Sequence, residues 1–143
     1  MSAITSDIIR EIVNYCKQHG IESVIIRRGL SNEYYTDTKT ININGNHSLR
    51  VQAYALFHEY GHHRIIQTPE LNKKFEKLID REAKNTLSEQ ILALEEEMLA
   101  WHFGEELARE LGIDLSDRSY QIFKSKCLKS HIVSYTKIVP EEE

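Results

Sequence analysis

The sequence has few cysteines and prolines and lacks a long run of apolar or basic residues. Its two cysteines, Cys16 and Cys127, lie far apart among charged residues, which excludes a disulfide framework and a paired-cysteine metal site. We expect two free thiols in a reducing compartment. No window is apolar and long enough to cross a bilayer, and residues 1–10 lack the basic and apolar regions of an export signal. The sequence therefore predicts a cytoplasmic protein that is not bound to a membrane.

Size and composition predict one ordinary globular domain. The 143 residues, 41% of them apolar and 28% charged, suffice for a single hydrophobic core but not for a second domain of similar size. We therefore expect one domain over residues 1–143. The net charge of -4 and the lack of a basic run give no electrostatic reason for nucleic acid binding, which depends on Lys and Arg. Direct DNA binding, and with it a DNA-associated regulator, is disfavoured.

Hydrophobic spacing predicts a mostly helical chain with a small sheet. Apolar residues at helical spacing indicate an amphipathic helix over 6–18 that ends at Gly20. β-branched and alternating residues predict a strand over 23–26 and a longer one over 34–43. Further helices are expected over 49–66, around 71–80, over 88–111 and over 116–128, and a short strand or packed tail over 131–139. The predicted fold class is α+β: a mostly helical single domain with a small sheet beside the helix over 49–66.

The helix over 49–66 begins and ends at clear signals. A turn at Asn44-Gly45-Asn46 precedes it, and Asn46 or Ser48 is the expected N-cap. The helix ends before Pro69, because a proline disfavours helical geometry in the residue that precedes it.

Inside this helix, residues 58–62 form the motif His-Glu-Tyr-Gly-His. His58 and His62 are four positions apart on one helical face, so their imidazoles can hold one divalent metal ion. Glu59 lies beside that ion and can contact a bound water, which is the position of a general base. Zinc held by two imidazoles and one carboxylate keeps a fourth position open and lowers the pKa of its water to about 7. We therefore predict a Zn²⁺ centre with His58 and His62 as ligands and Glu59 as the catalytic residue.

Gly61 lies between the two histidines and lowers the helix propensity there by up to ~1 kcal/mol. A close approach of another chain segment would explain a glycine at this position. The remaining histidines are expected at the surface or as helix caps, and these are His19, His47, His63 and His131.

Two segments carry a family resemblance. Thr40-Ile41-Asn42-Ile43-Asn44 leads through a turn into Ala55-Leu56-Phe57-His58-Glu59-Tyr60-Gly61-His62. This arrangement resembles the zincin metallopeptidases, and most closely the minimal ImmA/IrrE-like group. The resemblance covers roughly residues 25–104, and its only highly specific part is the five-residue motif. It implies an intracellular peptidase, often phage-encoded, that cleaves a regulatory protein such as a repressor.

The third metal ligand is expected from the acidic run Glu95-Glu96-Glu97. In the resembled group this ligand is a glutamate on a later helix, followed four residues on by an aromatic residue, which matches Glu97 and Trp101. Glu97 also borders the main apolar stripe of its helix next to Trp101, so its carboxylate can face inward. Glu95 borders the other side and Glu96 falls within a second stripe, so both stay open as alternatives. Met98 departs from the small residue that the group tends to place directly after the glutamate.

These residues together predict a zinc-dependent endopeptidase that hydrolyses a peptide bond in a protein partner. Glu59 would deprotonate the water and then pass the proton to the leaving amine. The alternative is a non-catalytic zinc-containing binding module that sequesters a host or phage protein. Such a structural site closes zinc with four protein ligands and has no use for a base beside it.

Substrate contacts are predicted at two places. The segment 38–43 is either an edge strand that pairs with a substrate backbone or a buried strand already paired on both sides. Tyr34, Tyr35, His102 and Tyr135 are the candidates for stabilising the oxyanion.

Overall fold

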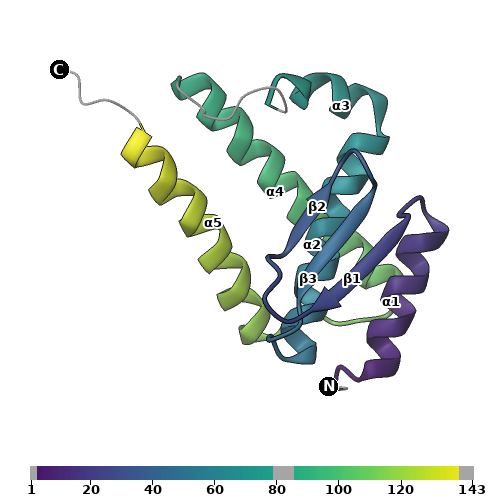
Figure 1. Ribbon diagram of the computed structural model, residues 1–143. Coiled ribbons are helices and arrows are strands. Elements are labelled where there is room, and N and C mark those ends of the chain that lie inside the picture. Colours follow the sequence, from purple (N-terminus) through teal and green to yellow (C-terminus); the bar gives the residue numbers. More distant parts are fainter. Residues whose placement is uncertain (1–2, 79–85, 139–143) are drawn as a thin grey trace.

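The computed structural model describes residues 3–78 and 86–138 and confirms the predicted α+β class. Five α-helices, one 3-10 helix and a three-stranded sheet lie within these residues (Figure 1). The helices are α1 (Ser6–Gln18), α2 (Leu49–Gln67), α3 (Pro69–Phe75), η1 (Glu76–Leu78), α4 (Leu87–Glu110) and α5 (Arg118–Ile138), and the strands are β1 (Ser23–Arg27), β2 (Glu33–Tyr35) and β3 (Thr40–Asn44). The predicted bounds of α1, α2 and α4 agree with these to within about one residue.

The opening helix α1 packs through its predicted apolar stripe. Thr5 caps the helix by accepting a hydrogen bond from the backbone N–H of Ile8 at 3.3 Å. Ile9, Ile12 and Cys16 are buried on one face. Both cysteines are free thiols, as predicted.

The sheet has the strand order β1-β3-β2, with β3 parallel to β1 and antiparallel to β2. The prediction of one strand over 34–43 is wrong, because residues 36–39 form a turn and Lys39 has a φ of 52°. The alternation of residue types continued through this turn, so periodicity alone did not reveal it. Since β3 is central and paired on both sides, the segment 38–43 is no edge for a substrate, and the two edges are β1 and β2.

Helix α2 lies at the centre, between the sheet and α4. Ser48, one of the two predicted caps, accepts a hydrogen bond from the backbone N–H of Val51 at 3.3 Å. Figure 1 shows α2 behind the sheet, with α1 and α5 on opposite sides of it. Ile41 and Ile43 of β3 are buried in the same cluster as Leu56 of α2.

The expected helix around 71–80 is present as α3 and η1, and its last two residues lie outside the described part of the chain.

Helices α2 and α4 touch backbone to backbone at two glycines. A Cβ atom on Gly61 would lie 1.9 Å from the carbonyl oxygen of Ala100, and one on Gly104 would lie 2.5 Å from the carbonyl oxygen of Phe57. Real Cβ contacts are essentially never shorter than 3.0 Å, so both positions need glycine. This confirms that another segment approaches Gly61 closely. The two contacts also fix how near α4 comes to the histidine motif.

Helix α5 extends further than the sequence predicts. The prediction of a short strand or tail over 131–139 is wrong for residues 131–138, because the chain stays helical to Ile138. Residue 139 lies outside the described part. The β-branched residues in this stretch favour a strand, but such a preference is weak and depends on context. Phe123 and Cys127 of α5 pack against the buried Trp101 and Tyr54. This packing directs one face of α5 toward α2 and α4.

Candidate metal centre

Helix α2 presents His58 and His62 to one point. Their Nε2 atoms lie 3.2 Å apart, and their ring planes make an angle of 72°. Trp101 of α4 stacks on the His58 ring at a centroid distance of 4.0 Å, which fixes the orientation of that imidazole. The side chains of His58 and His62 are only 9% and 17% exposed, so the point where they meet is sheltered from solvent.

Helix α4 brings Glu97 to the same point. Its start is fixed by a capping box, in which Thr86 and Glu89 each accept a hydrogen bond from the other's backbone N–H. Glu97 then lies one turn before the close contact at Ala100. Its Oε1 atom is 3.1 Å from His58 Nε2, and its Oε2 atom is 3.1 Å from His62 Nε2. Glu97 is thus the glutamate of the acidic run that contacts both histidines.

The three side chains fit a small divalent cation. Their ligand atoms all lie within 4.8 Å of one another, and they form the one such group among the described residues. Ligands at the usual zinc distances of 2.0–2.1 Å stand about 3.3–3.4 Å apart at the corners of a tetrahedron, close to the separations here. Glu97 Oε1 is buried without an aligned hydrogen bond, and a cation or a hydrogen-bond donor would satisfy it. The set of two imidazoles and one carboxylate suits divalent transition metals, zinc among them.

The other two glutamates of the run have different positions. Glu96 Oε2 accepts a hydrogen bond from His62 Nδ1 at 2.8 Å. This bond places the ring proton on Nδ1 and leaves the lone pair of Nε2 directed at the candidate metal position, as in carboxylate–histidine–metal arrangements. Glu95 is exposed. The alternative that Glu95 or Glu96 is the third ligand is therefore not supported by the positions of their side chains.

The centre attracts positive charge. Burial favours the neutral form of Glu97, but contacts with His131, His58 and His62 outweigh it and hold the pKa of this carboxyl well below its usual range. Burial also favours the neutral form of His62, which lowers its pKa. The carboxylates of Glu96 and Glu97 more than offset this effect and raise the pKa of His62 well above its usual value. A carboxylate that stays ionised in a sheltered site is a good partner for a metal cation.

Glu59 is buried in α2 beside the histidines, with a relative exposure of 7%. Burial raises the pKa of its carboxyl, the charges of His62 and His58 act against this, and the charge of Glu97 adds to it. Glu59 does not belong to the group of ligand atoms. It is therefore a further carboxyl next to the centre that is not needed to hold an ion.

Three of the four candidates for oxyanion stabilisation have other partners. The Tyr34 hydroxyl is 2.9 Å from His63 Nδ1, and the Tyr35 hydroxyl donates to Glu33 at 3.0 Å. His102 is exposed and lies 3.0 Å from a carboxylate of its own helix. The side chain of Tyr135 lies outside the described part of the structure.

His63 is fully buried, so its expected surface position is wrong. Its Nε2 atom donates to the backbone carbonyl of His19 at 2.9 Å, which leaves Nδ1 to accept from the Tyr34 hydroxyl. The ring therefore ties α2 to the end of α1 and to β2.

His131 is the residue of the centre that sequence reasoning missed. It was expected at the surface or as a cap, but its Nε2 atom lies 3.3 Å from Glu97 Oε1. A helix that ends at residue 128, as predicted, does not include His131, whereas α5 extends to Ile138. Continuing the helical spacing of Tyr120, Phe123 and Cys127 by one turn would have placed His131 on the same face.

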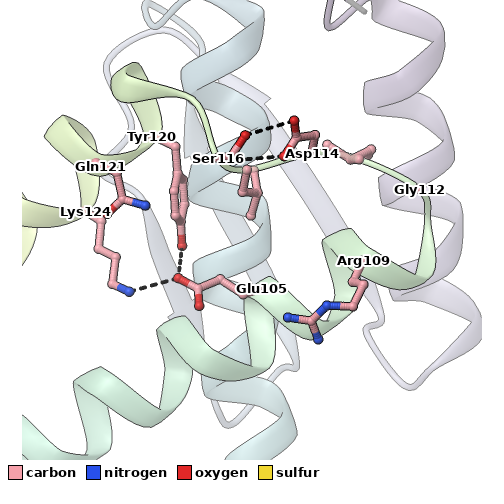
Figure 2. Close-up of a pocket in the computed structure, with 10 residues that line it drawn as sticks. Glu105, Arg109, Gly112, Asp114, Ser116, Tyr120, Gln121 and Lys124 are labelled. Carbon is pink, nitrogen blue, oxygen red and sulfur yellow. Dashed lines mark hydrogen bonds and ion pairs between the residues drawn. The ribbon is translucent and has the colours of Figure 1, made fainter. Parts of the chain in front are cut away.

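A separate pocket of about 500 Å³ lies where α4 is followed by α5 (Figure 2). Within it, Glu105 accepts hydrogen bonds from the Tyr120 hydroxyl at 2.5 Å and from the Lys124 ammonium at 2.8 Å. None of the candidate metal ligands lines this pocket. The pocket is therefore separate from the candidate metal centre.

Comparison of the chain with protein-family models, with curated proteins and with solved structures gave no match. None of the described helices combines the length and apolarity that a membrane span needs.

Proposed function

We propose that this protein is a zinc-dependent endopeptidase of the zincin type, similar to the minimal ImmA/IrrE-like group. One observation carries the proposal: two histidines of α2 and one glutamate of α4 converge within 4.8 Å, with the buried carboxyl of Glu59 beside them. A metal-binding group of this composition with an adjacent, uncommitted carboxyl is the arrangement that metal-assisted hydrolysis requires.

The number of ligands favours catalysis over a structural site. Structural zinc sites are closed by four protein ligands, whereas catalytic sites have three and keep one position for water or substrate. Over residues 3–78 and 86–138, the convergent group has three members: His58, His62 and Glu97. A structural zinc site, which only stabilises the fold, does not need the buried carboxyl of Glu59 beside it.

In the proposed reaction, zinc supplies Lewis-acid chemistry when bound, because it polarises the substrate carbonyl and lowers the pKa of a water. Glu59 takes a proton from that water, holds it on a carboxyl oxygen and delivers it to the nitrogen of the leaving amine. Burial raises the pKa of Glu59, which helps the carboxyl hold the proton between the two transfers. Glu96 keeps His62 oriented throughout, through its hydrogen bond to Nδ1.

The substrate in this proposal is a protein segment in extended conformation. Strand β2 is an edge of the sheet, and the hydroxyl of its Tyr34 lies 2.9 Å from Nδ1 of His63, so this edge lies beside the helix that carries the histidine motif. An edge strand offers unpaired backbone N–H and C=O groups to a peptide. The resemblance suggests a regulatory protein as the partner and the cytoplasm as the location.

The test compares wild type with Glu59→Gln, and uses the exposed Glu95→Gln as the matched control. Each protein is loaded with zinc and incubated with a denatured cell lysate, and new peptide N-termini are labelled and identified by mass spectrometry. We expect one zinc per chain in all three proteins, and cleavage by wild type and Glu95→Gln that falls by roughly 10²–10⁴-fold in Glu59→Gln. Equal cleavage by Glu59→Gln, or a wild type that binds zinc but cuts nothing, would favour the non-catalytic binding module.

A further inference from the structure

The carboxylate of Glu97 has two oxygens, and these differ in the side chains that they contact. Oε2 lies 3.1 Å from His62 Nε2, whereas Oε1 lies 3.1 Å from His58 Nε2 and 3.3 Å from His131 Nε2 without an aligned hydrogen bond to either. The Glu97 side chain is only 11% exposed. A buried carboxylate oxygen without a donor or cation is strongly destabilising, so both oxygens need partners.

A bound ion changes which groups can serve as those partners. If the Nε2 atoms of His58 and His62 hold an ion, their lone pairs face it and neither atom can donate to Glu97. The ion satisfies one carboxylate oxygen in a tetrahedral site, and the other oxygen needs a hydrogen-bond donor. Along the described chain, the remaining nitrogen in contact with Glu97 belongs to His131.

His131 does not lie where a ligand would. The ligand atoms within 4.8 Å of one another come from His58, His62 and Glu97, and His131 is outside that group. Its contact is with the carboxylate oxygen at 3.3 Å, slightly longer than an ordinary N–H···O hydrogen bond. A small rotation of the imidazole would align its N–H with Oε1.

We propose that His131 is a positioning residue that holds Glu97 from α5, so that metal binding and the docking of α5 stabilise each other. The inference rests on the proposed metal centre and concerns how that centre is held. Helix α5 reaches the centre at two points: Phe123 packs on Trp101, whose ring stacks on His58, and His131 contacts Glu97. Because the coupling between two binding events is reciprocal, docked α5 should raise metal affinity and bound metal should hold α5 in place.

The experiment measures Zn²⁺ affinity by competition with a chromophoric chelator in the full chain. Outer hydrogen-bond partners of metal ligands typically contribute 10–100-fold to affinity, so His131→Ala should weaken zinc binding by about that factor. His131→Gln keeps an N–H donor on the side chain and should recover part of the loss. The matched control is His102→Ala, which removes an exposed histidine of α4 that pairs with Glu106, and its affinity should equal that of wild type. Circular dichroism checks that each variant is folded.

Two further readouts separate positioning from other roles. Hydrogen exchange over residues 127–132 should slow when Zn²⁺ is added to wild type, and should respond less in His131→Ala. The visible spectrum of the Co²⁺-loaded protein should stay tetrahedral in His131→Ala, because the proposed ligands are unchanged. Loss of that spectrum would identify His131 as a ligand and overturn the positioning role.

The outcomes also distinguish this inference from the proposed function. Wild-type affinity in a folded His131→Ala variant would refute the role of His131 and leave the peptidase proposal intact. Coupling through His131 in a protein that binds zinc but cuts no peptide would support the inference and refute the peptidase proposal. A wild type that binds no Zn²⁺ would refute both.

Discussion

Replacing Gly61 by alanine should damage stability and metal binding together, because of the contact between α2 and α4. The added Cβ would start 1.9 Å from the carbonyl oxygen of Ala100 and must move to at least 3.0 Å, a displacement of about 1.1 Å. The obstacle is backbone, so no side chain can rotate away to relieve it. The two helices must therefore separate or bend.

The magnitude follows from two opposing effects. Overpacking of this kind destabilises by about 1–3 kcal/mol and occasionally more, and a backbone obstacle belongs at the upper end. Alanine in place of glycine stabilises the helix by up to ~1 kcal/mol through its higher helix propensity. We expect a net loss of about 2 kcal/mol for Gly61→Ala. A shift of that size near Ala100 also moves Glu97, one turn away, beyond the roughly 0.2 Å tolerance of a metal–ligand distance, so zinc affinity should fall as well.

Gly104→Ala is the control with a milder clash at the same helix contact. Its Cβ would start 2.5 Å from the carbonyl oxygen of Phe57, so the displacement needed is about 0.5 Å, and the gain in helix propensity offsets much of the strain. We expect a smaller loss, on the order of 1 kcal/mol or less. Urea unfolding at constant pH gives the stabilities, and chelator competition gives the zinc affinities. A Gly61→Ala protein as stable as wild type, or less affected than Gly104→Ala, would refute the close contact.

Two other variants test the environment of the centre and of the core. Glu96→Ala removes the acceptor of the His62 Nδ1 hydrogen bond and should weaken zinc binding by roughly 10–100-fold, whereas Glu95→Ala should not, and equal affinities of the two variants would exclude the orienting role. Burial raises the pKa of Cys16 to about 12 from 9.0, so between these pH values the unfolded chain releases the thiol proton while the folded chain keeps it. The stability that Cys16 contributes is therefore complete below pH ~9 and falls by about 1.4 kcal/mol per pH unit above it. Unfolding free energies between pH 8 and about 11 should fall less steeply in Cys16→Ala than in wild type, and identical slopes would contradict the burial argument.

The helices that carry the centre could be predicted because their signals are local. Ser48 caps α2, and helical spacing alone puts His58 and His62 on one face. Gly61 also predicts the close approach of another segment, which is the backbone of α4 at Ala100. Among the three adjacent glutamates, the sequence favours Glu97 through Trp101 four residues on but leaves Glu95 and Glu96 open. That choice depends on the rotation of α4 about its axis, which packing against α2 sets.

The two wrong predictions concern stretches whose residue types favour a strand. Residues 36–39 form an exposed turn instead, and residues 131–138 belong to α5. Phe123 and Cys127 of α5 pack against the cluster that contains Trp101, and the helix continues from there through the β-branched residues to Ile138. The position of His131 beside Glu97 follows from that packing, so the wrong helix end also concealed a residue of the centre.

The hydrogen bond between Tyr34 and His63 has a consequence for where a partner would be cut. It joins the edge strand β2 to the residue directly after His62, so β2 and α2 cannot slide past each other without breaking it. Under the proposed function, a peptide that extends the sheet at β2 would be held in one register with respect to the ion. Backbone pairing along β2 would then decide which bond is hydrolysed, and side chains near the cut would only adjust the rate.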